Sequence, residues 1–170
     1  MVGALVFAFT VDLGGGSHGS TPSTSVVGLH PLIGHAAPAF SLHTLDGRSV
    51  SLADYRGRPV IVNFWASYCE PCKIEFPLFK AARDRHAADG LEILGIVKAD
   101  DDLDAARRFA ASEGALWPLL PDEGGKTAAA YDAELFVPIS FYIDRSGIVR
   151  AVSFGPPPSG ALDDQLAKIL

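Results

Sequence analysis

Residues 60–72 read Val-Ile-Val-Asn-Phe-Trp-Ala-Ser-Tyr-Cys-Glu-Pro-Cys, and this stretch decides the fold prediction. Its first six residues, VIVNFW, form a continuous β-rich run, as expected of a strand that is buried on both faces. Residues 71–88 have the pattern of a helix that stops at Gly90. The two cysteines, Cys69 and Cys72, therefore lie between a buried strand and the beginning of a helix.

A cysteine at the first turn of a helix is chemically activated. The helix macrodipole and the unpaired backbone N–H groups stabilise a thiolate there, which lowers the thiol pKa toward neutrality. We expect Cys69, at the exposed edge of the helix, to be the nucleophile. Cys72 is expected to be more buried and close enough to form a disulfide with it. Pro71 suits the first turn, where its missing N–H costs nothing.

The composition narrows the class of protein. The chain has 170 residues, enough for one domain, and 48% of them are hydrophobic, as in a globular protein. The net charge is −6 and there is no run of Lys or Arg, which argues against nucleic acid as a partner. The two cysteines are too few for a disulfide-dense scaffold or a four-thiolate zinc site, although half of a zinc site or an inert pair stays an alternative.

The remaining pattern predicts an α/β fold with a central mixed β-sheet flanked by helices on both faces. An Asp-rich run, Asp100-Asp101-Asp102, lacks the features of a calcium loop and is expected to cap the helix that follows it. The expected elements are a hairpin of 38–42 and 50–52, strands at 91–97, 139–144 and 148–154, and helices at 102–113, 126–131 and 160–170.

The N-terminal part of the chain differs in composition from the rest. Residues 1–13 are mostly apolar, and we expect either an apolar tail or the remnant of a membrane anchor. Residues 14–31 are rich in Gly, Ser and Thr and are typical of a flexible linker. We expect the folded domain to comprise residues 32–170.

The stretch NFWASYCEPCKIEFP, residues 63–77, closely resembles the thioredoxin-like proteins of the TlpA/ResA type, which are extracytoplasmic thiol–disulfide oxidoreductases. Weaker similarities extend to both sides. The resemblance implies a thioredoxin-like fold in which Cys69 attacks a disulfide and Cys72 resolves the product. It also implies that Pro138 is a cis-proline facing the disulfide, and that the backbone of Val137 pairs with an extended substrate.

Glu75 is a further candidate for catalysis. It lies three residues after Cys72 and therefore shares its face of the helix. Its apolar sequence neighbours are Ile74, Phe76 and Phe79. A carboxyl group in such surroundings has a raised pKa and could take the proton of Cys72. The resemblance implies a functional acid at this position, whereas cytoplasmic thioredoxins carry a buried Asp where this chain has Asn63. The alternative is a solvated helix residue.

The resemblance also implies a substrate surface around the disulfide. Its expected members are Trp65, Tyr68, Glu70, Pro71, Val137 and Pro138. The chain departs from the family pattern at two places. Tyr68 stands where the family usually has Trp, and Phe136 stands where it usually has Gly near the cis-proline. Both changes bear on the choice of substrate.

The predicted function is thiol–disulfide exchange, most naturally the reduction of extracytoplasmic protein disulfides, for example in cytochrome c maturation. We expect a protein disulfide as substrate, a membrane thiol as electron donor, and no cofactor or metal besides the Cys69–Cys72 disulfide. The expected protein is a monomer outside the cytoplasm with a possible membrane tether. The alternatives are a peroxiredoxin-like peroxidase and a module that binds a metal or client through its two thiols.

Overall fold

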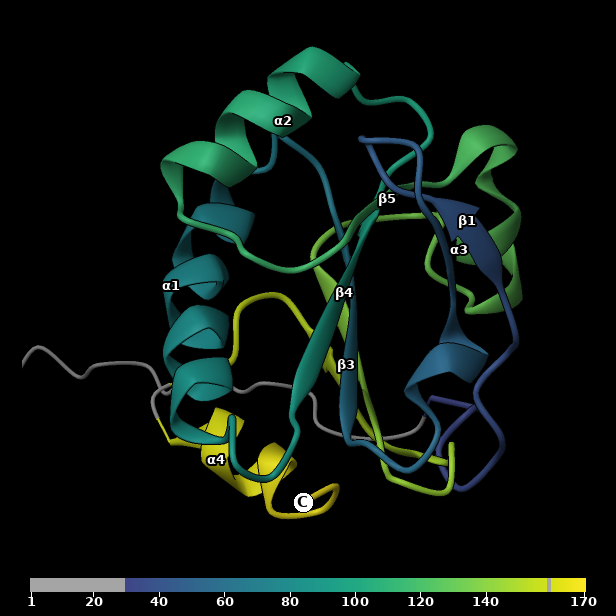
Figure 1. Cartoon of the computed structure of the whole chain (residues 1–170), viewed down its shortest axis with the longest axis vertical. Helices are drawn as coiled ribbons and strands as arrows, with labels where there is room; N and C mark the ends of the chain where they lie inside the picture. Colours follow the sequence, from purple (N-terminus) through teal and green to yellow (C-terminus); the bar gives the residue numbers. More distant parts are fainter. Residues whose placement is uncertain (1–29, 159) are drawn as a thin grey trace, which may run out of the picture.

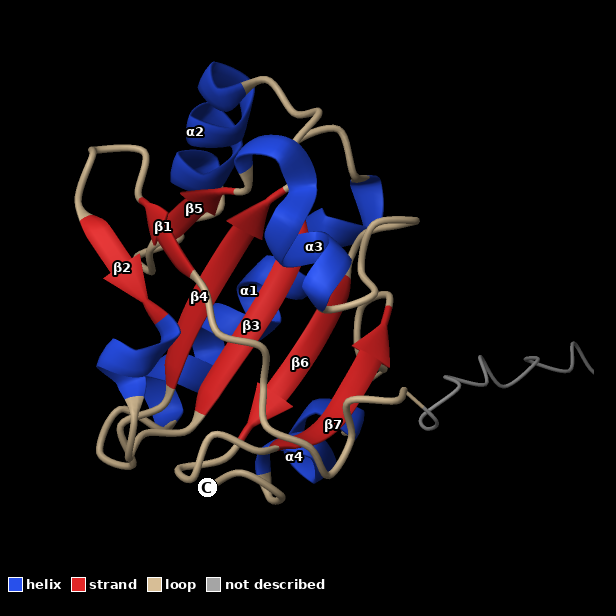
Figure 2. Ribbon diagram, turned by 90° about the vertical axis from the view of Figure 1, so that its right-hand side faces the viewer, coloured by secondary structure: helices blue, strands red, loops and turns tan. Residues whose placement is uncertain are grey.

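A five-stranded mixed sheet forms the centre of the computed structural model, which describes residues 30–158 and 160–170. β3 (Val60–Trp65) runs parallel to β4 (Glu92–Val97) and antiparallel to β6 (Ile139–Ile143). β5 (Leu119–Pro121) and β7 (Val149–Phe154) are the two outer strands, as Figure 2 shows. The predictions for residues 1–29 lie outside the described residues.

Helices cover both faces of this sheet. One face carries α1 (Glu70–Arg85), α2 (Leu103–Ser112) and α4 (Ala161–Leu166) (Figure 1). The other face carries α3 (Lys126–Ala130) and a small hairpin, and its short elements are β1 (Ser41–His43), β2 (Ser49–Ser51), η1 (Leu52–Tyr55) and η2 (Glu123–Gly125). The predicted α/β architecture is confirmed.

The central strand explains why both faces must be covered. All six residues of β3 are buried. Because successive side chains of a strand point to opposite faces, Ile61 and Trp65 pack on the side of α1, whereas Val62 and Phe64 pack on the other side. A strand of this kind needs an apolar layer on each face, which helices supply on one side and α3 together with the small hairpin supplies on the other.

The structure adds a strand that the sequence pattern does not reveal. β5 has only three residues and ends at Pro121, which has no N–H for a sheet ladder. This proline is tolerated because β5 lies at the edge of the sheet. The helices are also shorter than expected: α1 ends at Arg85 rather than at residue 88, and α4 covers only 161–166.

The first described residue is already packed against the domain. His30, which falls in the predicted linker, is buried, and its ring lies 5.0 Å from that of Phe141 in an edge-on contact. Burial lowers the pKa of His30. Among the helices of the described residues, none has the length and apolar character that crossing a membrane requires.

Candidate active site

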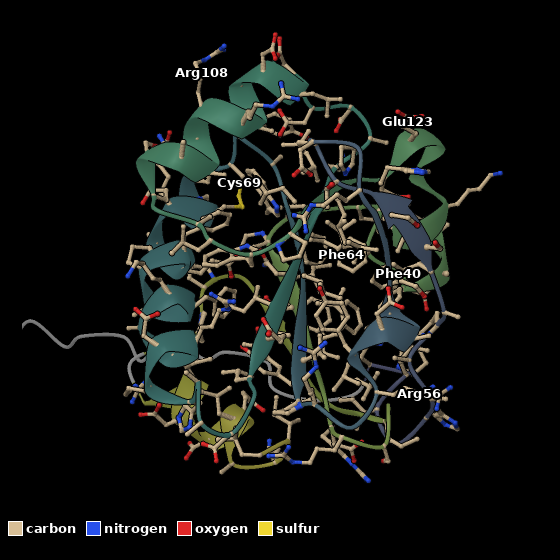
Figure 3. The ribbon with its side chains drawn as sticks, viewed as in Figure 1. Phe40, Arg56, Phe64, Cys69, Arg108 and Glu123 are labelled. Carbon is tan, nitrogen blue, oxygen red and sulfur yellow. A yellow bond between two sulfur atoms is a disulfide. The ribbon has the colours of Figure 1, made fainter. Side chains whose placement is uncertain are left out.

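A disulfide joins Cys69 and Cys72 where β3 gives way to α1, and their Cα atoms are 5.4 Å apart. Cys69 is the N-cap residue of α1, and its Sγ accepts a hydrogen bond from the backbone N–H of Cys72 at 3.2 Å. Figure 3 shows Cys69 at the end of α1 that lies nearer to α2. Cys69 is 6% exposed and Cys72 is 0% exposed, so the outer sulfur belongs to Cys69.

Glu75 lies on the same helix and is completely buried. Its Oε1 accepts a hydrogen bond of 2.6 Å from the side-chain amide of Asn63 on β3. Burial raises the pKa of Glu75 well above its ordinary value, and the hydrogen bond from Asn63 opposes this shift. The carboxyl group is therefore suited to holding a proton inside the protein. The alternative of a solvated helix residue is wrong.

One of the expected neighbours of Glu75 is misplaced by the sequence pattern. Phe76 and Phe79 are fully buried, but Ile74 is 63% exposed. The reason is the helical period, because adjacent residues of a helix are about 100° apart and Ile74 lies on the solvent side of α1.

The loop before β6 reaches the same end of the sheet. Since β6 runs antiparallel to β3, its first residues lie beside the last residues of β3, with Ile139 paired to Phe64. The Val137–Pro138 peptide bond that precedes them is cis. Pro138 is buried and its carbonyl oxygen accepts from the N–H of Gly155 at 2.9 Å, whereas Val137 is half-buried. The fold thus brings this loop to the end of the sheet that carries the disulfide.

Trp65 does not belong to the surface of the site. It is 0% exposed, stacks on Phe109 at 5.3 Å and meets the edge of Phe76 at 5.0 Å. A β-carbon at Gly95 on β4 would lie 2.9 Å from Nε1 of Trp65, so the indole occupies the space that this glycine leaves. The placement of Trp65 on the substrate surface is therefore corrected, because its side chain points into the core.

Of the other residues expected on the substrate surface, Tyr68, Glu70 and Pro71 are exposed, whereas Val137 is half-buried and Pro138 is buried. Tyr68 is 56% exposed, and both Glu70 and Pro71 are exposed at the first turn of α1. Glu70 forms an ion pair with Lys73 at 2.5 Å. Phe136, one of the two departures from the family pattern, is 48% exposed and its ring lies 5.7 Å from that of Phe154.

Of the three aspartates that the sequence assigned to a helix cap, only Asp102 serves as one, whereas Asp100 and Asp101 bind the loop before Cys69. Asp102 does cap α2, accepting from the N–H of Ala105 at 2.8 Å. Asp101, however, accepts from both the N–H and the hydroxyl of Ser67 at 2.6 Å each. The loop after β4 is thereby attached to the loop that leads into Cys69.

Asp100 makes a second connection between the same loops. It accepts from the hydroxyl of Tyr68 at 2.9 Å and pairs with Lys98 at 3.2 Å. These hydrogen bonds lower the pKa of Asp100. Tyr68 and Asp100 are 32 residues apart in sequence, and Ser67 and Asp101 are 34 apart, so no local signal could have identified these two contacts. Residues 30–158 and 160–170 contain no group of three or more His, Cys, Asp or Glu arranged to hold a metal ion.

Comparison with known proteins agrees with this geometry. Residues 33–152 match the AhpC/TSA family. The chain belongs to that family. Its thioredoxin-like domain carries the Cys69–Cys72 pair at the end of a central strand, as the resemblance to the TlpA/ResA type implied.

The relatives of this chain include proteins named as thiol–disulfide oxidoreductases. It is 31% identical over 137 residues to the thiol–disulfide oxidoreductase ResA of Bacillus thuringiensis subsp. konkukian, covering 81% of this chain and 78% of the relative. It is 30% identical to the thioredoxin-like protein YneN of Bacillus subtilis, covering 78% of each chain.

Solved structures support the same placement. A Chlorobium tepidum thiol:disulfide interchange protein of the thioredoxin family superposes with a TM-score of 0.69 and 29% identity, covering 78% of this chain and 93% of that one. This chain is accordingly an enzyme, a thiol–disulfide oxidoreductase of the ResA/DsbE type.

Proposed function

We propose that the protein reduces disulfides of other proteins outside the cytoplasm, with Cys69 as nucleophile, Cys72 as resolving thiol and Glu75 as the group that takes the proton of Cys72. The observation that carries this proposal is the Cys69–Cys72 disulfide at the N-terminus of α1, with a buried carboxyl group three residues further along the helix.

The reaction starts from the dithiol form. The Cys69 thiolate attacks a substrate disulfide, a new S–S bond forms to one substrate sulfur, and the other leaves as a thiolate. Cys72 then loses its proton to Glu75 and attacks Cys69, which forms the Cys69–Cys72 disulfide and releases the second substrate sulfur. Two electrons have passed to the substrate. A membrane thiol donor must return them, and the chain needs no cofactor besides its own disulfide.

The charges around the disulfide support a reductant rather than an oxidant. An oxidant of this class stabilises its thiolate strongly. Here Glu70 directly follows Cys69, while Asp100 and Asp101 are bonded to Tyr68 and Ser67. The nearby cations Lys73 and Lys98 pair with Glu70 and Asp100 and are thereby partly neutralised. Negative charge disfavours a thiolate, which favours the disulfide form and a donor of electrons.

A mixed-disulfide trap tests the function. In a Cys72→Ser variant expressed in the native host, the first step can occur but the second cannot, so Cys69 should stay joined to its substrate. Covalent adducts that dithiothreitol releases are expected, and mass spectrometry identifies them. A Cys69→Ser variant is the matched control and should form none. If Cys72→Ser traps no protein in the host, the exchange proposal is wrong.

The direction of exchange has its own measurement. Titration of the pair against glutathione buffers should give a reduction potential well below that of an oxidant. A value near −120 mV, which is typical of a strong oxidant, would overturn the reductant assignment. Among the adducts trapped by Cys72→Ser, apocytochromes c would place the enzyme in cytochrome c maturation, and their absence would remove that pathway from the proposal.

A location outside the cytoplasm, with residues 1–13 as a tether, is part of the same proposal. It is supported by the apolar composition of these residues and the Gly/Ser/Thr-rich residues 14–31 that follow. Fractionation of the native host should find the full chain in the cell envelope, exposed to added protease in spheroplasts. Recovery in the cytoplasmic fraction contradicts this location.

A further inference from the structure

A row of side chains crosses the sheet beneath α1. The strand register pairs Asn63 of β3 with Ser140 of β6, and both residues are completely buried. Asn63 reaches Glu75 on α1 from this row. Three polar groups from three separate elements therefore meet inside the apolar core. Such groups are expensive to bury, so a reason for their presence is required.

The hydrogen bonds of Asn63 account for both hydrogens of its amide. A side-chain amide nitrogen carries two N–H donors. One donates to Oε1 of Glu75 at 2.6 Å, and the other donates to the hydroxyl oxygen of Ser140 at 3.0 Å. Ser140 thus holds the amide in place through a second hydrogen bond from the same nitrogen. The same residue lies two positions after Pro138, on the strand that continues from the cis-proline loop.

The two oxygens of Glu75 are consequently unlike. Oε1 is occupied by the amide of Asn63, while Oε2 is buried and has no hydrogen-bond partner among the described residues. A buried carboxylate oxygen without a partner is unfavourable, and a proton on that oxygen removes the charge.

We propose that Asn63 and Ser140 are positioning residues for Glu75: Ser140 holds the Asn63 amide, and the amide occupies Oε1, so that Oε2 is the oxygen that carries the exchangeable proton. This inference rests on the proposed function, in which that proton comes from Cys72. The amide dipole also makes the ionised carboxyl group less unfavourable, which allows Glu75 to release and accept a proton during turnover.

The surroundings of Glu75 make Asn63 the main polar influence on it. Among the described residues, the titratable side chains that are buried with it on this side of the sheet are Tyr142 of β6 and the two cysteines at the N-terminus of α1, which are joined in the disulfide. Burial raises the pKa of Tyr142, so its hydroxyl stays neutral during the reaction. The buried residues that β3, β4, α4 and the C-terminal segment after α4 contribute to this side are uncharged, namely Ile61, Trp65, Ile93, Gly95, Val97, Leu162, Gln165, Leu166 and Ile169.

Two variants test this arrangement in the full-length protein. Asn63→Leu removes both N–H donors and keeps a side chain of similar size, so the pKa of Glu75 should rise by about one unit or more. Ser140→Ala leaves the amide in place but removes the group that holds it, so the pKa should rise by a smaller amount. Ser140→Thr keeps the hydroxyl and should restore the value of the unchanged protein. NMR titration of the Glu75 carboxyl carbon measures its pKa in the oxidised form of the unchanged protein and of each variant.

A kinetic measurement gives the second readout. The resolution of a mixed disulfide by Cys72 should show a pH profile displaced upward in Asn63→Leu and Ser140→Ala. Each unit of displacement slows the step about tenfold on the acidic side of the profile. A purely structural role would lower stability without moving the profile. Circular dichroism of each variant at the pH of the assay establishes that it is folded. Ser140→Ala removes only one buried oxygen atom, so it still tests the inference if Asn63→Leu does not fold.

The failures of the two proposals can be told apart. If Asn63→Leu and Ser140→Ala leave the titration of Glu75 unchanged, the positioning inference is wrong even though the exchange reaction proceeds. If the unchanged protein shows no exchange with any protein disulfide, the proposed function is wrong, whatever the titration of Glu75. A Ser140→Thr variant that titrates like Ser140→Ala would remove Ser140 from the positioning set.

Discussion

The backbone N–H of Cys72 donates to the sulfur of Cys69 over 3.2 Å, at the first turn of α1. This contact joins the two sulfur-bearing residues in a second way besides their disulfide. In the reduced protein, the same N–H and the positive end of the helix dipole stabilise a thiolate on Cys69. Cys72 has no comparable position, because it lies within the helix and is fully buried.

The two thiols should therefore differ in reactivity. We expect iodoacetamide to alkylate Cys69 at least about tenfold faster than Cys72 in the reduced protein near neutral pH. Peptide mass spectrometry of samples quenched over time distinguishes the two sites. Single variants provide the control, since Cys72→Ser should react at the fast rate and Cys69→Ser at the slow one. Equal rates would contradict a role for the helix N-terminus.

Glu75 should make stability depend on pH. Below pH 4.5, the ordinary pKa of this carboxyl group, both the folded and the unfolded protein hold its proton. Above that pH the unfolded chain loses the proton first, because burial raises the pKa of the folded form. The free energy of unfolding then falls with rising pH, at about 1.4 kcal/mol per unit, until the folded form ionises as well. Glu75→Gln should lack this contribution.

Urea denaturation of the oxidised protein from mildly acidic to mildly alkaline pH measures the effect. The difference between the unchanged protein and Glu75→Gln isolates Glu75, because all other titrating groups are common to both. The free energy of unfolding of Glu75→Gln, relative to that of the unchanged protein, should increase as pH rises. If the free energy of unfolding changes with pH in the same way for both proteins, Glu75 ionises as readily in the folded protein as in the unfolded chain.

Asp101 should contribute more to stability than an ordinary surface aspartate. Its two hydrogen bonds to Ser67 hold the loop that precedes Cys69. Asp101→Ala should lower the free energy of unfolding by about 1–3 kcal/mol, as for bonds to a charged acceptor. Asp104, which forms an exposed ion pair with Arg107, is the matched control, and Asp104→Ala should cost less than about 1 kcal/mol. If both variants lose the same free energy of unfolding, the hydrogen bonds from Asp101 to Ser67 do not stabilise the loop before Cys69.

Phe136 should influence the choice of substrate without affecting the chemistry. It is exposed beside the cis-proline loop and contacts Phe154. Phe136→Gly should change KM for a protein disulfide by several-fold, while the reaction with a small disulfide such as hydroxyethyl disulfide stays the same. Leu170→Ala, at the C-terminus near the opposite end of the molecule in Figure 1, is an exposed apolar control. A loss with both substrates would show instead that Phe136 supports the reacting groups.

The fold was largely predictable because its central signals are local. The six-residue run VIVNFW, in which only Asn63 is polar, indicates a strand covered on both sides, and Gly90 limits the following helix, which ends five residues earlier at Arg85. β5 was not predictable, since three residues ending in Pro121 form a strand only through pairing with β4. Trp65 was misplaced for a related reason, because its direction depends on which face of β3 the helix α1 covers.

The sequence by itself placed Cys69, Cys72 and Glu75 close together, since helical spacing holds them within one short segment. Only the tertiary structure decided what surrounds them. Asn63 and Ser140 are 77 residues apart, and Tyr68 and Asp100 are 32 apart, yet each pair is in hydrogen-bond contact. Contacts of this kind depend on strand register and loop position, which arise when the whole sheet assembles and leave no periodic trace in the chain.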